Sequence, residues 1–398
     1  MSELNKTPSG NRIHICILGR RNSGKSSLIN ALTNQNTALV SDVPGTTTDP
    51  VYKAMELNGI GPCVFVDTAG FDDEGSLGNM RVAKTEEAVK KCHMVFMVFG
   101  NQGLQLEEQW IEKLKQDNVP VILVFNERQG NAEAIEKRKL EIEEYFKSQC
   151  IVVNASTSAN VSSLYKIIGE NLPEDFETRS ITEGVVSQGD RVLLVMPQDI
   201  QAPKGRLILP QVQTIRDLLD KKCVVTSTTV DTLDKALETF LCPPDVIITD
   251  SQAFKAVYEK KPEKSKLTSF SILFAAHKGD LSYYIESVKK IEFLNAQSRI
   301  LIAEACTHAP KEEDIGRVKI PNMLRKRISP EINIDFVRGT DFPRNLSQYD
   351  LIIHCGGCMF NRKYIMNRVN EAKNQGVPMT NYGVVMAYIS GILDKVSM

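Results

Sequence analysis

The chain has 398 residues, more than one ordinary hydrophobic core holds, and this length predicts three domains. Its residues are 42% hydrophobic and 24% charged with a net charge of -1, so the basic excess of a nucleic-acid-binding protein is missing. No apolar run approaches the roughly 18 residues of a membrane span, and the first residues carry no apolar secretion signal. We therefore expect a cytoplasmic protein that binds neither nucleic acid nor a membrane.

The first predicted element is an apolar strand at residues 12–19 that leads into a phosphate-binding loop and a helix. The string "GRRNSGKSS", Gly19 to Ser27, matches the GxxxxGKS pattern in the strand–loop–helix context that the pattern requires. Loop amides and the helix N-terminus present positive partial charge to phosphates, and Lys25 adds a full charge. The Ser26 hydroxyl is a candidate magnesium ligand. These residues predict a nucleotide-binding site.

A polar loop and a second strand complete the predicted phosphate site. The loop "SDVPGTTTDP", residues 41–50, holds Thr46, Thr47 and Thr48, of which one, assigned as Thr47, reaches magnesium only when the terminal phosphate is present. The strand that ends in "VFVDTAG" places Asp67 in the outer shell of magnesium and the Gly70 amide near the terminal phosphate. The threonine loop is therefore a predicted switch.

Together these strings resemble the translation-factor-class GTPases, in the group that includes the tRNA-modifying and ribosome-assembly GTPases. The likeness extends to Asn22 in the phosphate loop and to "PGTTTD", residues 44–49, in place of that group's PGTTRD. It implies that Asn22 helps to hold a potassium ion, which supplies the charge of an arginine finger. Phe71 follows DTAG where a Ras-like protein has its water-orienting Gln. Potassium-stimulated, intrinsically slow GTP hydrolysis is the implied activity. The implied catalytic residues are Lys25, Asn22, Thr46, Thr47, Thr48 and Gly70.

The base-binding end departs from that group's pattern. After a strand at 119–125 the group has NKxD, whose Asp accepts two hydrogen bonds from guanine, whereas this chain has "NERQ", residues 126–129. Gln129 offers one acceptor oxygen beside two donors and does not reproduce this pairing. GTP stays the predicted nucleotide, with weaker affinity and selectivity. The backbone of Ala155 is expected to line the base pocket. The predicted GTP-binding residues are Gly19, Asn22, Ser23, Gly24, Lys25, Ser26, Ser27, Asp67, Gly70, Asn126 and Ala155, and the magnesium set is Ser26, Thr47 and Asp67.

A polar, acidic stretch at residues 172–184 ends the predicted GTPase domain. Strand-like runs at 192–196, 223–229 and 246–250, with a helical pattern at 209–222, predict a small α/β module for self-association. The charged string at 259–266 is typical of a solvated linker. The predicted domains are 1–174, 175–266 and 267–398.

Strands and helices alternate in the C-terminal third, which predicts a mostly parallel sheet. Ligands of such sheets collect beyond the carboxyl ends of the strands. Cys306 and Cys355 each end a predicted strand and Cys358 follows one short loop later, so we expect these cysteines to converge. The predicted strands are 270–277, 299–306, 332–339, 350–355 and 377–382, and the helices lie near 284–294 and 363–374.

Six of the nine cysteines stand singly in apolar surroundings and are predicted core residues. They are Cys16, Cys63, Cys92, Cys150, Cys223 and Cys242. The other three lie in "ACTHAP" and "IHCGGC", beside two histidines. A redox dithiol uses only the CxxC pair, structural zinc takes four protein ligands, and an iron–sulfur cluster takes all three thiolates. The zinc set is Cys306, His308, Cys355 and Cys358; in the iron–sulfur case the fourth iron is open or weakly held by His308, His354, Glu304 or a small molecule. Either histidine is as well suited to a hydrogen bond with the cluster or its cysteines.

The CxH string, the later HCxxC string and their order behind a GTPase domain and a middle α/β domain resemble the FeFe-hydrogenase maturation GTPases, the HydF family. This resemblance spans essentially all 398 residues. It implies a four-iron four-sulfur (4Fe-4S) cluster on Cys306, Cys355 and Cys358. It also implies a scaffold that carries the di-iron precursor of the hydrogenase active site to the apo-hydrogenase. A homodimer formed by the middle domain and radical-SAM maturases as partners are further implications.

The predicted fold is therefore α/β: a P-loop GTPase domain with a mostly parallel sheet, a small α/β dimerisation domain and an α/β iron–sulfur cluster domain. Two other functions stay open. One is a potassium-dependent GTPase of tRNA modification or ribosome assembly with a structural zinc domain, which the near-neutral charge disfavours. The other is a redox-sensing GTPase, which requires a disulfide between Cys355 and Cys358 during function.

Overall fold

The computed structural model describes residues 9–33, 50–57, 60–72, 75–128, 130–172, 179–196, 207–305, 314–339 and 341–398. The chain divides into two compact units, Met1–Phe176 and Glu177–Met398. Among the helices of the described ranges, none combines the length and the apolar character that a membrane crossing demands.

A six-stranded sheet forms the centre of the first unit, in the order β2-β3-β1-β4-β5-β6. All neighbouring strands are parallel except β2 and β3. The strands are β1 Ile13–Leu18, β2 Val51–Leu57, β3 Gly61–Asp67, β4 Met94–Phe99, β5 Val121–Asn126 and β6 Cys150–Val153. β1 and β4 are buried along their whole length, which explains their continuous apolar runs.

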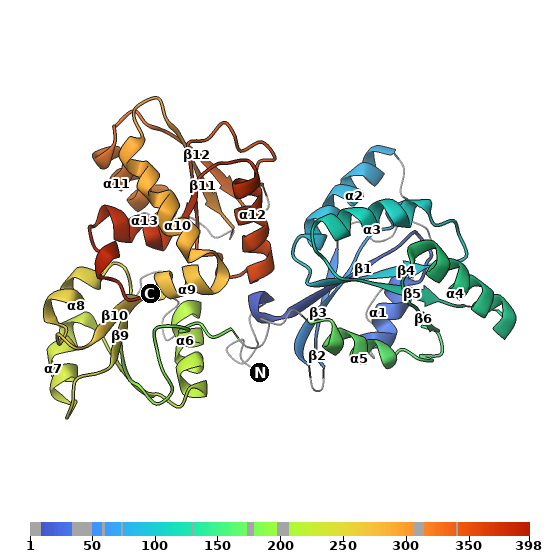
Figure 1. Cartoon of the computed structure of the whole chain (residues 1–398), viewed down its shortest axis with the longest axis horizontal. Coiled ribbons are helices and arrows are strands. Elements are labelled where there is room, and N and C mark those ends of the chain that lie inside the picture. Colours follow the sequence, from blue (N-terminus) through green and yellow to red (C-terminus); the bar gives the residue numbers. More distant parts are fainter. Residues whose placement is uncertain are drawn as a thin grey trace. The chain divides into compact units, whose positions relative to one another are not determined.

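Helices cover both faces of this sheet (Figure 1). One face packs against α2 Gly75–Val89, α3 Gln105–Gln116 and α4 Ala132–Phe146, and the other against α1 Lys25–Thr33 and α5 Ser163–Glu170. The phosphate loop connects β1 to α1 at the carboxyl edge of the sheet, where ligands of parallel sheets bind. The predicted P-loop domain with a mostly parallel sheet is confirmed.

The second unit contains two parallel four-stranded sheets, in the orders β10-β9-β7-β8 and β12-β11-β13-β14. The first sheet consists of β7 Arg191–Val195, β8 Val224–Thr228, β9 Val246–Thr249 and β10 Lys266–Ser269. The second consists of β11 Arg299–Glu304, β12 Asn333–Arg338, β13 Leu351–His354 and β14 Met379–Asn381. One continuous hydrophobic core contacts both sheets, because buried side chains of β7, β9, β11 and β13 belong to it together.

The helices of the second unit lie between and beside its strands. They are α6 Leu209–Asp220, α7 Leu233–Glu238, α8 Phe254–Lys260, α9 Phe270–Lys278, α10 Leu281–Val288, α11 Ile320–Arg327, α12 Arg362–Asn374 and α13 Tyr382–Ile389. Short turns of helix occur at η2 Ser9–Asn11, η3 Val230–Thr232, η4 Lys289–Phe293, the π-helical η5 Ile315–Lys319 and η6 Leu393–Lys395. The alternation of strand and helix agrees with the predicted parallel sheets.

One sequence prediction is wrong: residues 270–277 form helix α9 and not a strand. Ser269 ends β10 and caps the helix, since its hydroxyl accepts a hydrogen bond from the amide of Ile272. The helix is apolar on all sides because one side packs with β7 and β9 and the other belongs to the core shared with β11 and β13. An apolar run without a polar face has no period that distinguishes a buried helix from a strand.

The structure also bears on the predicted core cysteines and on the predicted domain boundary at residue 266. Five of the six single cysteines are buried, but Cys242 is exposed in the proline turn after α7, beside the fully exposed Leu241. The predicted boundary at residue 266 falls inside β10, which pairs with β9 through residues 266–269. The division into three domains stays a prediction.

Candidate functional site

The phosphate loop turns sharply between β1 and α1. Gly24 has φ +93°, and a Cβ atom there would collide with the side-chain amide of Asn126, so only glycine fits. Asn22 has φ +58°, the left-handed conformation that asparagine tolerates better than most residues. The loop is therefore fixed by its own sequence and by its contact with β5.

Lys25 begins α1 and is 7% exposed. Its Nζ donates hydrogen bonds to the carbonyl oxygens of Gly19, at 2.9 Å, and Arg20, at 2.8 Å. The ammonium group thus lies inside the loop, at the carboxyl end of β1, where a phosphate would meet the loop amides.

Ser26 and Asp67 face each other across the carboxyl ends of β1 and β3. The Ser26 hydroxyl donates to Asp67 Oδ2 at 2.6 Å, and the other carboxylate oxygen, Oδ1, is buried without a hydrogen-bond partner in the described part of the chain. Burial raises the pKa of Asp67, although Ser26 and Lys25 oppose the rise. A buried carboxylate oxygen beside a hydroxyl is a donor set that suits magnesium, so the residues present fit the predicted magnesium site.

Gly70 and Phe71 follow β3. Gly70 lies against the phosphate loop, because a Cβ atom there would come 2.6 Å from the backbone nitrogen of Arg21. Phe71 is 8% exposed and stacks on Trp110 of α3, with ring centroids 5.8 Å apart. The side chain at this position is therefore part of the core and cannot orient water.

On the base side, Asn126 ties three segments together. Its Nδ2 donates to the carbonyl of Ser23 at 3.3 Å, and its Oδ1 accepts from the amide of Ala155 at 3.1 Å. Asn154 donates to Glu127 at 2.6 Å, and its Oδ1 accepts from two following amides. The predicted residues Asn126 and Ala155 thus lie together, whereas Thr46, Thr47, Thr48 and Gln129 lie outside the described residues.

Sequence reasoning missed an ion pair that anchors the phosphate loop. Arg20 donates to both carboxylate oxygens of Glu107 in α3, at 2.8 and 3.0 Å, and to the carbonyl of Gly103. Glu107 is 2% exposed. Because the two residues are 87 positions apart, no local pattern could have paired them.

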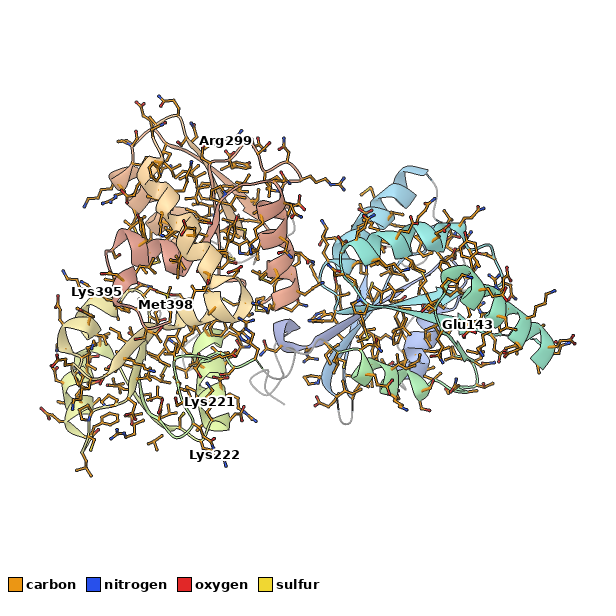
Figure 2. All side chains as sticks on the ribbon, viewed as in Figure 1. Glu143, Lys221, Lys222, Arg299, Lys395 and Met398 are labelled. Carbon is orange, nitrogen blue, oxygen red and sulfur yellow. The ribbon has the colours of Figure 1, made fainter. Side chains whose placement is uncertain are left out.

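The second candidate site lies at the carboxyl ends of β11 and β13. Arg299, labelled in Figure 2, marks the amino end of β11. At the carboxyl end Ala303 is in register with His354, and the amide of Cys355 donates to the Ala303 carbonyl at 2.9 Å. The amide of Ala305 then donates to Cys355 Sγ at 3.0 Å. The residue before Cys306 is thus in contact with the Cys355 sulfur, whereas Cys306 and His308 themselves lie outside the described residues.

His354 and Glu304 each have partners of their own. His354 is fully buried; its Nε2 accepts from Arg368 at 3.0 Å and its Nδ1 donates to the Cys355 carbonyl at 2.6 Å. Burial, aided by the charge of Arg368, lowers the pKa of His354 to about 3. Glu304 Oε2 accepts from Arg317 at 3.0 Å and from Arg338 at 3.2 Å.

The loop between Cys355 and Cys358 turns through two glycines. Gly357 has φ +59°, and a Cβ atom there would come 2.5 Å from Ile365. Burial raises the pKa of Cys358, and the neighbouring Cys355 adds to the rise. Within the described ranges no group of three His, Cys, Asp or Glu side chains assembles into a metal site. The tight loop, with the Ala305 amide directed at Cys355 Sγ, nevertheless suits thiolate ligation, so the residues present fit a cluster.

Comparison with known families assigns each part of the chain. The model of the 50S ribosome-binding GTPase matches residues 14–127, which contain β1, the phosphate loop and the Ser26–Asp67 pair. The first unit is thus a GTPase domain. The models of the Hydrogen maturase F dimerization domain and tetramerization domain match residues 181–279 and 282–397, which together make up more than half of the chain. The chain belongs to the hydrogen maturase F family of GTPases, as the resemblance predicted.

Curated GTPases are similar to part of the chain. The tRNA modification GTPase MnmE of Moorella thermoacetica is 35% identical over 135 residues, 33% of this chain and 29% of its own length. GTPase Der of Chromobacterium violaceum is 35% identical over 168 residues, 41% of this chain and 35% of its own length. The chain thus spans about a third of the length of the curated relatives it matches.

Solved structures are also similar to part of the chain. An Era variant from Aquifex aeolicus bound to GDP and AlF4- has a TM-score of 0.38 and 26% identity, covering 40% of this chain and 57% of that one. The NFeoB protein of S. thermophilus bound to GDP, AlF4- and K+ has a TM-score of 0.31 and 19% identity, covering 40% of this chain and 61% of that one.

Proposed function

We propose that the chain is a GTP-hydrolysing iron–sulfur scaffold that holds the di-iron precursor of the FeFe-hydrogenase active site and delivers it to the apo-hydrogenase. The observation that carries this proposal is the contact between the Ala305 amide and Cys355 Sγ. It brings the chain that continues into Cys306 to the CGGC loop, in a protein of the hydrogen maturase F family.

GTP hydrolysis follows from residues that are already in place. On nucleotide binding, Lys25 exchanges the carbonyls of Gly19 and Arg20 for phosphate oxygens, and the loop amides neutralise further charge. Ser26 as a direct ligand and the buried Asp67 through water would hold magnesium, and the Gly70 amide would contact the terminal phosphate. Magnesium supplies charge neutralisation at the phosphates when it is bound.

Asn22 is proposed to turn its side-chain oxygen to a potassium ion. Its left-handed backbone is set by the loop, and Phe71 is buried against Trp110, so no polar side chain at that position orients water. A cation at the phosphates would compensate for this, and hydrolysis would be slow without it.

In the C-terminal part, Cys306, Cys355 and Cys358 are proposed to hold a 4Fe-4S cluster. The Ala305 amide stabilises the Cys355 thiolate, and the Gly356–Gly357 turn brings Cys358 back toward it. Because both ring nitrogens of His354 are engaged with Arg368 and the Cys355 carbonyl, we assign His354 to the outer shell. Glu304 is paired through Oε2 with Arg317 and Arg338, so His308 or a small molecule is the proposed ligand of the fourth iron.

The chain is further proposed to form a homodimer through residues 181–279, and the dimerization and tetramerization descriptions of its family models support self-association. Radical-SAM maturases would build the precursor, and the GTP cycle would tune the association with these partners. The interior of the cell is the proposed location.

Activation of an apo-hydrogenase tests this function. The chain is co-expressed with the radical-SAM maturases, purified without oxygen and mixed with apo-hydrogenase, and hydrogen evolution is measured. The wild-type chain and Cys242→Ala, a change at an exposed cysteine outside the site, should activate the hydrogenase, whereas Cys355→Ala should not. Activation by Cys355→Ala equal to that by the wild type would show that the cysteine site is not needed for delivery and would contradict the scaffold function.

A further inference from the structure

Lys278 is a buried lysine in the last turn of α9 and is 3% exposed. No pattern in the sequence distinguishes it from a surface lysine. The helix that carries it is held on both sides. Leu273 and Phe274 pack with the first sheet of the second unit, and Ile272 packs in the core that both sheets share. The Nζ atom lies 5.8 Å from the centre of the Phe274 ring. The position of the ammonium group is therefore fixed by the core.

The ammonium group of Lys278 donates hydrogen bonds to backbone carbonyls in and just after the CGGC loop. Nζ donates to the carbonyl oxygens of Gly357 at 3.2 Å, Cys358 at 3.0 Å and Phe360 at 2.8 Å. An ammonium group donates through three protons, so it can bind several carbonyls at once. Three carbonyls converge on one point only because the loop coils, which the left-handed Gly357 allows.

A buried ammonium group is costly unless it is hydrogen bonded, and a hydrophobic helix such as α9 would be more stable with an apolar side chain there. The loop benefits as well, because without Lys278 its carbonyl oxygens would lose the hydrogen bonds that this lysine donates. Asn361 then ends the loop by capping α12, where its side chain accepts from the amide of Tyr364 at 3.0 Å. Lysine and cap together fix both ends of the segment that carries Cys358.

We propose that Lys278 is a positioning residue of the cluster site: it clamps the backbone around Cys358 and places a fixed positive charge beside the cluster. The effect on the cluster rests on the proposed function. The clamp, which consists of the hydrogen bonds from Lys278 to the loop, is present in the chain without metal. Lys278 belongs to the match of the dimerization domain, at residues 181–279, and the loop belongs to the match of the tetramerization domain. The clamp therefore joins the two matched parts at the cysteine loop.

A fixed positive charge near an iron–sulfur cluster favours its reduced form, because the reduced cluster carries one more negative charge. Lys278→Gln removes the charge but keeps an amide that donates to carbonyls, whereas Lys278→Arg keeps the charge. The matched control is Lys289→Gln, which changes a lysine on the surface that pairs with Glu286. All four proteins are reconstituted with iron and sulfide without oxygen, and the reduction midpoint is measured by titration.

We expect the midpoint of Lys278→Gln to lie below that of the wild type, Lys278→Arg to restore it, and Lys289→Gln to match the wild type. In the metal-free proteins, alkylation of Cys358 followed by mass spectrometry should be at least about threefold faster in Lys278→Met than in the wild type, because the loop opens more often. A wild-type midpoint in Lys278→Gln together with a wild-type alkylation rate in Lys278→Met overturns the inference. A wild type that takes up no cluster overturns the proposed function instead, and the alkylation rates alone then decide the clamp.

Discussion

The GTPase domain should lose stability as the pH falls, because His14 is buried as a neutral ring. His14 lies in β1, is 5% exposed, and its Nδ1 donates to the Arg12 carbonyl at 2.9 Å. Burial, aided by the charges of Lys91 and Arg12 and opposed by the hydrogen bond to the Arg12 carbonyl, lowers the pKa of His14 from 6.5 to about 4. His14 is therefore protonated below about pH 6.5 in the unfolded chain but only below about pH 4 in the folded domain. The contribution to stability is complete above pH 6.5 and is lost as the pH falls.

Each pH unit inside this window costs about 1.4 kcal/mol, so acidification from pH 6.5 to pH 5 should cost about 2 kcal/mol from this residue. His14→Gln supplies a neutral side chain whose amide can donate to the same carbonyl. Trp110 is the single tryptophan of the chain and lies in α3, so its fluorescence reports urea unfolding of this unit.

The free energy of unfolding is measured for both proteins at pH 7 and pH 5. The loss between these values should be about 2 kcal/mol larger in the wild type than in His14→Gln. Contributions from titratable groups remote from residue 14 cancel in this difference. An equal loss in the two proteins would show that protonation of His14 does not destabilise the folded domain in this pH range.

Three further predictions concern the nucleotide site. Lys25→Ala should lower GTP turnover at least about 100-fold, measured as phosphate release, while the exposed control Lys166→Ala keeps wild-type turnover; equal turnover of the two variants would exclude Lys25 from hydrolysis. Replacing potassium with sodium should slow wild-type hydrolysis at least roughly tenfold, and Asn22→Ala should be slow in both salts; the same response in Asn22→Ala as in the wild type would contradict the potassium role. Glu107→Ala should lower the free energy of unfolding of the first unit, measured by urea unfolding, by about 3 kcal/mol, because it leaves the Arg20 guanidinium without its buried carboxylate. The control Glu108→Ala changes a partly exposed residue one position away and should change this free energy by less than about 1 kcal/mol.

Local sequence predicted those parts of the molecule that depend on local chemistry. The phosphate loop was recognisable because its glycines and Lys25 must stand at fixed spacing, and the strands of parallel sheets because they are apolar throughout. The same apolar character misled at α9, where burial on two sides removed the polar face that marks a helix.

The residues that were missed depend on tertiary pairing. Nothing local separates the buried Glu107 from its partly exposed neighbour Glu108, because the difference lies in Arg20 on another element. Lys278 likewise stands at the end of an apolar helix, where a solvent-facing lysine is common. Its positioning role depends on hydrogen bonds to three carbonyls about 80 positions away. Convergence of Cys355 with the chain before Cys306 could be predicted, since both follow parallel strands, but the engagement of both nitrogens of His354 could not.

The proposed function requires an iron–sulfur cluster on the cysteine loop. This requirement is tested most directly by iron and sulfide analysis, with an optical spectrum, of protein purified without oxygen and reconstituted with iron and sulfide. We expect about four irons and about four sulfides per chain and a broad band near roughly 400 nm, all lost in Cys306→Ala and Cys355→Ala and kept in Cys242→Ala. One tightly bound, colourless zinc per chain that resists exchange for iron would contradict the account.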